Sequence, residues 1–359
     1  MRTTEGSAQS HNQEDSMSEL YYIGLDVHKK TISYCIKKKD GTIVARGTIE
    51  ATRAALTAWA SSINRPWVGG LEATLFTGWI HDHLAPYAVE LQVAHPAMLK
   101  AIACGKKKND RLDAEKICDL LRCDLLPRCY LAPPAMRELR RVLRYRHLLV
   151  SEAVRMKNKI SGLLLEVGEP YDARRLHGRK YFHEHLDSLR DTPESVIELL
   201  TITRGSLEMF DSLQRRLLHG LDRHPLLRER VELLRSVDAV GEVTALTWAL
   251  EVVEPRRFGS IGRTVSYCGL CSAQRESAGK TQRGPLSKQR NKHLQRVLIE
   301  AAKLAPRWNP QLRAVYEREL QRGPRNRATL AVARKLVAYL WAVDISGRPF
   351  VPRVEVEAA

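Results

Sequence analysis

The stretch YYIGLDVHKKTISYCIKKKDGTIVARGT, residues 21–48, predicts the start of a β-sheet. It holds three short runs rich in β-branched and aromatic residues, YYIGLD, TISYCIK and TIVARGT. Lysines and the pair Asp40–Gly41 separate these runs and act as turn signals. We therefore expect three consecutive strands at the beginning of the first folded region.

Beyond residue 48 the sequence alternates between helical and strand-like segments. Expected helices are residues 52–63, 76–87 and 110–121, and expected strands are WVGGLE (67–72) and ELQVA (90–94). Three strands followed by alternating helix and strand form the element order of a ribonuclease-H-like domain with a mixed five-stranded sheet. The first region is therefore expected to be an α/β domain of this kind.

Four carboxylates occupy informative positions in this order of elements. Asp26 and Glu72 each close an apolar strand, whereas Asp110 and Asp113 share one face of the expected helix. Hard divalent cations such as Mg²⁺ or Mn²⁺ prefer oxygen ligands, and two cations about 4 Å apart can clamp the attacking and leaving oxygens of a phosphodiester. Taken singly, each carboxylate also fits an ordinary turn, strand end or helix cap. Their type, order and spacing together predict a metal site for phosphodiester chemistry.

The charge of the chain favours a polyanionic partner. The 359 residues include 58 Lys and Arg against 41 Asp and Glu, which gives a net charge of +17. No run of about 18 apolar residues suggests a membrane span, and the polar N-terminus lacks the apolar segment of a signal peptide. We therefore expect a cytoplasmic nucleic-acid-binding protein with no membrane partner.

Several side chains of functional type have plain structural interpretations. Cys268 and Cys271 form a CxxC without the partners of a zinc site, so they are expected to be packing thiols in a reducing compartment. His28 follows Asp26 by two residues and fits either the same site or an ordinary strand-face residue, of which the second is favoured. The tryptophans at positions 67, 79, 248 and 341 stand in apolar contexts, which favours core packing over base stacking.

The middle of the chain is expected to be helical. Prolines at positions 127, 133 and 134 mark a boundary, and residues 135–167 then carry apolar residues near a 3.5-residue repeat. The other face of this helix is dominated by Arg and Lys, which fits either a solvated face or a face turned toward nucleic acid. A second helix, residues 194–221, is expected either to return antiparallel to the first or to pair between subunits.

The last third of the chain combines helices with a basic loop. Residues around Gly241 resemble a helix-hairpin-helix, which offers backbone N–H groups to phosphate, although a plain helical turn fits equally well. The segment RESAGKTQRG, residues 275–284, is expected to be a loop. A basic helix, KQRNKHLQRVLIEAAKLA, and a closing buried helix, LAVARKLVAYLWAV, follow it.

Seven motifs together resemble the DEDD transposases of bacterial insertion sequences, the one-ten group. They are IGLDVHK, the Glu after a Gly-rich strand, KKNDRLDA, RYRHLLVSEAVRMKNKI, YCGL with ESAGK, NKHLQRVLIEAA, and AVARKL with LW. They run in the family's order from Tyr21 to about Trp341. Each motif is weak by itself, but the collinear set is specific.

The resemblance implies the architecture of the whole chain. We expect a disordered tail (1–19), a RuvC-like ribonuclease-H domain (20–130), a helical coiled-coil linker (131–230), a mainly helical C-terminal transposase domain (231–343) and a second tail (344–359). It also implies that Asp26, Glu72, Asp110 and Asp113 bind the metal. By the same resemblance Ser277 is the nucleophile of a 5′-phosphoserine intermediate.

Two departures from the family pattern affect the serine. Residues 276–278 read Glu-Ser-Ala where the family commonly has Ser-Ser-Gly, and Arg290 replaces a usual glycine. Ser277 is the only serine in the loop core, while Ser272 and Ser287 flank it. The nucleophile is therefore assigned by its place in the loop rather than by the complete motif.

The resemblance further implies partners: double-stranded DNA at the element ends and target, a structured guide RNA, and a homo-oligomer, either dimer or tetramer. Basic residues near the motifs are expected to contact phosphates. These are Lys106, Lys107, Lys108, Arg144, Lys157, Lys159, Lys280, Arg283, Lys288, Arg290 and Lys292. Two rival functions stay open, namely a RuvC-like nuclease that uses water as nucleophile, and a non-enzymatic nucleic-acid-binding protein.

Overall fold

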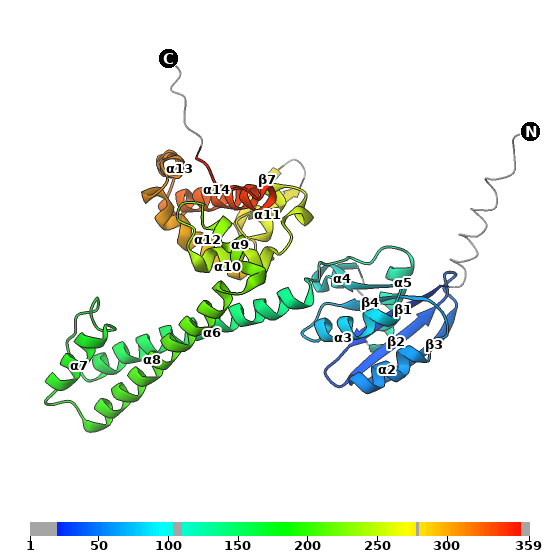
Figure 1. Ribbon diagram of the computed structural model, residues 1–359, viewed down its shortest axis with the longest axis horizontal. Coiled ribbons are helices and arrows are strands. Elements are labelled where there is room, and N and C mark those ends of the chain that lie inside the picture. Colours follow the sequence, from blue (N-terminus) through cyan, green and yellow to red (C-terminus); the bar gives the residue numbers. More distant parts are fainter. Residues whose placement is uncertain (1–19, 103–109, 278–279, 353–359) are drawn as a thin grey trace, which may run out of the picture. The chain divides into compact units, whose positions relative to one another are not determined.

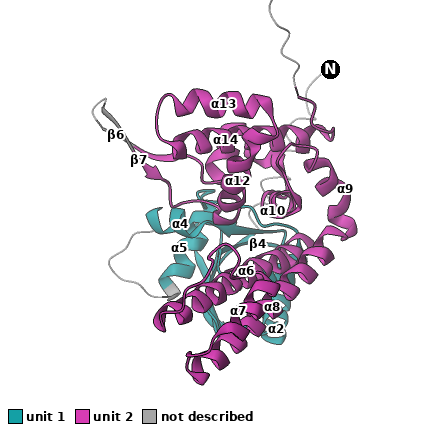
Figure 2. Cartoon of the chain, turned by 90° about the vertical axis from the view of Figure 1, so that its left-hand side faces the viewer, with its two compact units in different colours: residues 1–134 teal, residues 135–359 magenta. Residues whose placement is uncertain are grey.

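Two units make up the chain, residues 1–134 and residues 135–359 (Figure 2). The computed structural model describes residues 20–102, 110–277 and 280–352. The expected tail at 1–19, the last seven residues of the second tail and Lys106 to Lys108 lie outside these ranges. Within the described residues, no helix is long and apolar enough to cross a membrane.

The first unit is built on a mixed five-stranded sheet (Figure 1). Its strands are β1 (Tyr21–Val27), β2 (Thr31–Lys37), β3 (Ile43–Glu50), β4 (Trp67–Glu72) and β5 (Glu90–Ala94), in the spatial order β3-β2-β1-β4-β5. The first three strands are antiparallel, whereas β4 pairs parallel to β1 and β5 pairs parallel to β4. The predicted mixed sheet is confirmed, and its order is consistent with a RuvC-like domain.

Helices cover both faces of this sheet. They are α2 (Arg53–Ser61), α3 (Thr77–Leu84), the 3₁₀ helix η1 (Ala85–Tyr87), α4 (Pro96–Ile102) and α5 (Asp110–Arg122). Alternate residues of β1 serve different cores because strand side chains alternate between faces. Ile23 and Leu25 pack in one core with Leu56 of α2 and Ile80 of α3. Tyr22 packs in the other core, which α5 covers.

Helix α5 lies unusually close to β1. A Cβ atom added at Gly24 would stand 2.5 Å from the backbone nitrogen of Cys118 and would overlap the carbonyl oxygen of Ala114. The Cys118 thiol also donates to the carbonyl oxygen of Tyr22 over 3.2 Å. Because Cys118 lies beside Tyr22 and Ala114 beside Gly24, α5 runs antiparallel to β1. Its N-terminal turn therefore reaches the end of the strand that carries Asp26.

The second unit starts with two long helices. Helix α6 (Pro134–Glu166) and helix α8 (Glu194–Asp222) lie side by side in Figures 1 and 2, with α7 (Arg179–Ser188) at their connection. Ile160 of α6 and Leu200 and Leu207 of α8 share one buried core. The Thr192 hydroxyl donates to Glu169 over 2.7 Å and so joins the end of α6 to the start of α8. Helix α8 thus returns antiparallel to α6 within the chain.

Shorter helices form the rest of the second unit. They are α9 (Pro225–Leu234), α10 (Glu242–Val252), η2 (Pro255–Phe258), α11 (Ile261–Tyr267), α12 (Lys292–Leu304), η3 (Ala305–Arg307), α13 (Pro310–Leu320) and α14 (Arg325–Ser346). Their core includes the fully buried Trp248 of α10 and Leu336 of α14. The expected burial of the closing helix is confirmed.

The segment expected to be a loop contains a β-hairpin. Strands β6 (Ser272–Ser277) and β7 (Lys280–Leu286) pair antiparallel, and Ser277 pairs with Lys280. The prediction of a loop over 275–284 was wrong because Gly, Ser and Lys are weak strand formers, and pairing between the two segments overrides that preference. The basic helix also begins later than expected, at Lys292, with the Asn291 side chain accepting from the backbone N–H groups of His293 and Leu294.

Two histidines stack within the second unit. The rings of His147 on α6 and His293 on α12 lie nearly parallel, and their Nδ1 atoms are 3.1 Å apart. Burial lowers the pKa of His147 to about 4, and the charges of His293, Arg146 and Arg296 add to this effect. The pair is therefore neutral at pH 7.

Substitution of Gly24 by alanine should destabilise the protein by about 1–3 kcal/mol, because the new methyl group overlaps the backbone of α5. Gly162→Ala is the matched control, since nothing lies within 4 Å of its added Cβ in the interior of α6. That control should gain about 0.5–1 kcal/mol from helix propensity. Urea unfolding measures both changes, and equal stabilities would contradict the close approach of α5.

The stability of the protein should fall as the pH drops from about 6.5 toward 4. In that window an unfolded histidine binds a proton that His147 resists, so protonation favours the unfolded chain. Full stability from this group is present above about pH 6.5. Unfolding free energies at pH 7 and pH 5 should differ less in His147→Gln than in the wild type or in the exposed control His219→Gln. Identical pH dependence in all three would contradict this role.

Candidate active site

Asp26 and Glu72 are neighbours at the ends of two parallel strands. The register of β1 and β4 pairs Leu25 with Leu71, and the two carboxylates are the next residues on their strands. Tyr22, Gly24 and Asp26 share one face of β1 by alternation. On β4, Glu72 stands on the same face as Gly70, whose added Cβ would lie 3.2 Å from Ile117 of α5. Both carboxylates thus stand on the α5 side of the sheet.

The first turn of α5 supplies the helical part of the acidic set. Asp110 begins the helix, and Asp113 precedes Ala114, the residue packed against Gly24. The antiparallel course of α5 brings this turn to the end of β1 where Asp26 lies. The Asp113 carboxylate accepts from the Lys116 ammonium over 3.0 Å and is 28% exposed. The structure describes the backbone position of Asp110 and not its side chain.

His28 contacts Asp26 although the sequence favoured an ordinary strand-face residue. Its Nε2 atom lies 3.1 Å from Oδ2 of Asp26, and its side chain is about half exposed while that of Asp26 is only 13% exposed. The signal in the sequence is the spacing of two residues, since side chains two apart in an extended chain point the same way. His28 therefore orients the Asp26 carboxylate.

The donor set fits a hard divalent cation. Carboxylate oxygens are the preferred ligands of Mg²⁺ and Mn²⁺, and two carboxylates on adjacent parallel strands repel each other less when a cation lies between them. Among side chains that the structure describes, no group of three or more His, Cys, Asp or Glu is close enough to form a complete site. Asp26 and Glu72 would hold a cation, and Asp110 and Asp113 stand on the helix turn that would complete the set.

Ser277 lies in the second unit, at the end of β6. It is the last residue of β6 and pairs with Lys280, the first residue of β7. The backbone of both residues is described, whereas their side chains and that of Arg283 are not. The pairing of β6 with β7 holds the backbone of Ser277.

Two models of transposase families match this chain, one in its first half and one in its second half. Residues 23–168 match the family model of the DEDD transposases of the IS110 group, and residues 231–317 match that of the transposase IS116/IS110/IS902 family. Together the two matches span more than half of the chain. The chain belongs to the IS110 family of transposases.

Curated relatives of the family match over most of their length. The transposase for insertion sequence element IS1328 of Yersinia enterocolitica is 24% identical over 93% of this chain and 99% of its own length. The transposase for insertion sequence element IS1111A of Coxiella burnetii is 24% identical over 91% of this chain and 90% of its own length. A probable family 20 transposase of Pseudomonas aeruginosa is 25% identical over 69% of this chain.

The sequence predicts a set of basic residues that contact phosphate. Most members of this set whose side chains the structure describes stand on the surface of this IS110-family chain. Lys288 and Arg290 precede α12, and Lys292 begins it; all three are exposed. The Arg290 guanidinium donates to the carbonyl oxygen of Ser287 over 2.7 Å. On α6, Lys157 is partly buried and Lys159 is exposed. These positions leave the five side chains accessible to phosphate. Their assignment as phosphate contacts stays a prediction.

Arg144 forms an ion pair that the sequence did not indicate. Its Nε and Nη2 atoms donate to the two carboxylate oxygens of Glu251, each over 2.8 Å. Glu251 lies on α10 and has no exposed surface. The row of basic residues along α6 gave no sign of this partner, which stands 107 residues away in the sequence. The contact of Arg144 with phosphate stays a prediction.

The surroundings of Glu251 keep its carboxylate charged. Burial alone would raise the pKa of this group, but hydrogen bonds and charge from Arg144, Asn291 and Arg140 outweigh burial and hold the pKa below its usual value. The Asn291 side chain donates to Glu251 over 2.8 Å. One buried carboxylate therefore ties together α6, α10 and the start of α12.

Removal of the Arg144 side chain should destabilise the second unit by about 2–4 kcal/mol, since Glu251 would keep a buried charge without its bidentate partner. Arg141→Ala removes an exposed arginine from the same helix and should change stability by less than about 0.5 kcal/mol. Thermal and urea unfolding of Arg144→Ala and Arg141→Ala make the comparison. Equal stability of the two variants would contradict the structural role of Arg144.

Proposed function

We propose that this chain is a DNA transposase that cuts and rejoins DNA through a covalent 5′-phosphoserine intermediate on Ser277. Asp26, Glu72, Asp110 and Asp113 hold the divalent cation, Mg²⁺ or Mn²⁺. Membership of the IS110 family supports DNA as the substrate. The element ends and the target are double-stranded DNA, and the reaction is a phosphoryl transfer.

The observation that carries this proposal is the pair of carboxylates at the ends of β1 and β4. The chain has a net charge of +17, which attracts nucleic acid. The carboxylates lie on adjacent strands, beside a helix that starts with Asp-Arg-Leu-Asp, and they repel a phosphate. A bound cation reverses that repulsion. A purely architectural DNA-binding protein has no use for such a set.

The chemistry of the serine explains how strands are exchanged without ATP. The Ser277 hydroxyl attacks phosphorus, loses its proton, and displaces the 3′-oxygen of the cut strand, which leaves as a hydroxyl. A 3′-hydroxyl of another strand then attacks the phosphoserine and releases the serine. When bound, a divalent cation supplies charge neutralisation at the phosphate and favours loss of the hydroxyl proton. The number of phosphoester bonds stays the same throughout.

An RNA guide and an oligomer complete the proposed function. The family resemblance supports a structured RNA encoded by the element, and a dimer or tetramer that brings two DNA duplexes together. The exposed Lys159, Lys288, Arg290 and Lys292 are available for phosphates of either nucleic acid. This reaction takes place in the bacterial cytoplasm, on the nucleoid.

A second candidate is a RuvC-like nuclease that uses water as nucleophile. It is favoured by one observation: all four carboxylates belong to the first unit, and none comes from the unit that holds Ser277. Hydrolysis would leave free ends and no covalent adduct. The hairpin that carries Ser277 and the basic segment after it would then have no part in the chemistry.

A covalent-trap assay tests the proposal. The full chain is incubated with DNA of its element end, the flanking RNA and Mg²⁺, and a denaturant-resistant protein–DNA adduct is sought. We expect an adduct with the wild type and none with Ser277→Ala or Asp26→Asn, because one variant lacks the nucleophile and the other a cation ligand. Strand joining should fall by at least about a thousandfold in both variants.

Matched controls separate these losses from general damage. Ser272→Ala changes an exposed serine on the same strand, and Glu50→Gln changes an exposed carboxylate on β3; both should retain the adduct. Cleavage without an adduct, unchanged in Ser277→Ala, would support the nuclease instead. Binding without cleavage in Mg²⁺ and in Mn²⁺ would favour the non-enzymatic alternative.

A further inference from the structure

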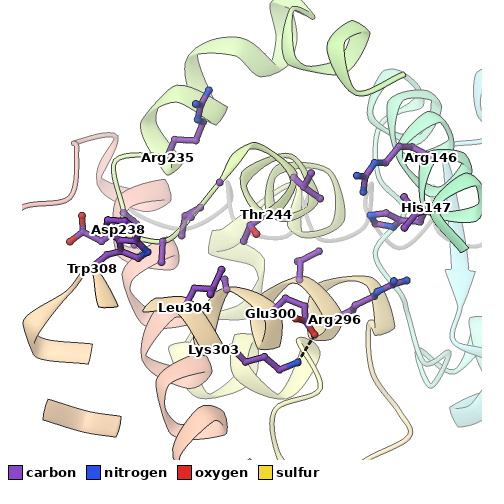
Figure 3. Close-up of a pocket in the computed structure, with 18 residues that line it drawn as sticks. Arg146, His147, Arg235, Asp238, Thr244, Arg296, Glu300, Lys303, Leu304 and Trp308 are labelled. Atoms are coloured by element: carbon purple, nitrogen blue, oxygen red, sulfur yellow. Dashed lines mark hydrogen bonds and ion pairs between the residues drawn. The ribbon is translucent and has the colours of Figure 1, made fainter. Parts of the chain in front are cut away.

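A cavity of about 840 Å³ opens in the second unit, and its lining residues include neither the four carboxylates nor Ser277 (Figure 3). Its walls come from α6, from the turn between α9 and α10, and from α12 and the residues after it. Val240, Val297 and Leu304 contribute apolar surface. None of the functions proposed above uses this cavity.

Three arginines give the cavity a positive charge. Arg146, Arg235 and Arg296 line it, and none of them forms an ion pair with any residue that the structure describes. The Nε atom of Arg146 is buried and has no hydrogen-bond partner among the described residues. A buried guanidinium N–H without an acceptor is costly, so an acceptor from a bound molecule would be favoured.

The acidic groups of the cavity are already engaged within the protein. The Lys303 ammonium donates to Glu300 over 2.7 Å, as the dashed line in Figure 3 shows. The Asn309 side chain donates to Asp238 over 3.0 Å. His147 adds no charge at pH 7 because its pKa is about 4. Glu242, in the first turn of α10, interacts electrostatically with Arg146 and Arg235, and burial raises the pKa of its carboxyl. The three arginines outnumber this carboxylate, so the cavity favours an anion.

The turn before α10 adds backbone donors on the same wall. Gly241 caps this helix without a side chain, and Val243 and Thr244 of its first turn line the cavity. The first backbone N–H groups of a helix have no partner within the helix and carry partial positive charge. Phosphate oxygens satisfy such groups well. The turn at Gly241, which the sequence indicated as a candidate phosphate-binding turn, therefore offers backbone N–H donors to a phosphate in the cavity.

The exposed indole of Trp308 stands at the end of the cavity opposite Arg146. Figure 3 shows Trp308 beside Asp238 at one end, and Arg146 with His147 at the other. Trp308 is 70% exposed, whereas Trp67 and Trp248 are buried. It follows η3 directly and precedes Asn309, whose side chain caps α13, so its backbone is fixed. A fixed, exposed indole offers a flat face to a planar partner.

We propose that this cavity binds an unpaired segment of a nucleic acid strand that is several nucleotides long. Phosphates of the segment lie against Arg146, Arg296 and the first turn of α10, and a base farther along the segment stacks on Trp308 at the other end of the cavity. A paired base hides both of its faces in the duplex, so only an unpaired base can use the indole. The proposed site requires neither the cation nor Ser277, and its failure would leave the proposed reaction unaffected.

Binding measured without divalent cations tests the site. Fluorescence anisotropy of the full chain in EDTA is recorded with labelled single-stranded RNA, single-stranded DNA and duplex DNA of one sequence, with a labelled mononucleotide as the fourth arm. Trp308→Ala should weaken binding of the single strands by roughly 5- to 100-fold and leave duplex binding unchanged. The control Tyr145→Ala removes an exposed aromatic residue outside the cavity and should have no effect.

Substitution of an arginine should change both the affinity and its dependence on salt in the same assay. Arg296→Gln should weaken single-strand binding and lower the slope of log affinity against log salt by about one. Arg318→Gln removes the same charge from an exposed position on α13 and should leave that slope unchanged. Tighter binding of RNA or of DNA identifies the strand that uses the site, and binding of the mononucleotide alone would overturn the proposal in favour of a free ligand.

Photo-crosslinking locates the base directly. Single strands that carry 5-iodouracil in place of uracil or thymine should crosslink to Trp308, as mapped by mass spectrometry of the digested protein. The crosslink should weaken in Arg146→Gln and in Arg296→Gln, because the strand would lose the phosphate contacts that hold it in the cavity. Absence of a Trp308 crosslink with both RNA and DNA, together with wild-type affinity of Trp308→Ala, would overturn the proposal.

Discussion

The contact between α5 and β1 at Gly24 is the constraint on which the carboxylate site depends. Only a residue without a side chain allows the backbone of Ala114 and Cys118 to come so near the strand. That approach fixes the register of the helix along the sheet. The first turn of α5 is thereby held at the end of β1, beside Asp26. A helix held farther from the sheet would leave two strand carboxylates without their helical counterparts.

A buried carboxylate has the corresponding role in the second unit. Glu251 accepts from Arg144 and from Asn291, while its backbone carbonyl oxygen accepts from the Tyr267 hydroxyl over 3.0 Å. Four segments of the chain meet at this residue. The same segments bring α6, the α10 turn and α12 together around the cavity, and Arg296 is one turn along α12 from the cap at Asn291. The packing that satisfies Glu251 thus positions Arg146, Arg296 and Gly241 around one space.

The proposed functional residues differ in how well the local sequence predicts them. Asp26 and Glu72 were found because each ends an apolar strand, and two parallel strands then place them in register. The separation of two residues between Asp26 and His28 allowed a shared site, but the sequence favoured an ordinary strand-face residue, and only the structure brings Nε2 of His28 to 3.1 Å from Oδ2 of Asp26. Trp308 was not singled out at all, because exposure of an aromatic residue between short helical segments cannot be seen in a pattern of neighbours.

The sequence by itself determined the order of elements, the mixed five-stranded sheet, the strand carboxylates and the family, because periodicity, turn chemistry and motif order are local properties. Only the tertiary structure decided that residues 272–286 form a hairpin, that Arg144 serves Glu251, and that three arginines and an indole surround one cavity. The physical reason is the range of the interactions. A strand needs a partner strand, and a charged side chain takes the nearest opposite charge. For Arg144 that partner stands 107 residues farther along the chain, beyond the reach of any local pattern.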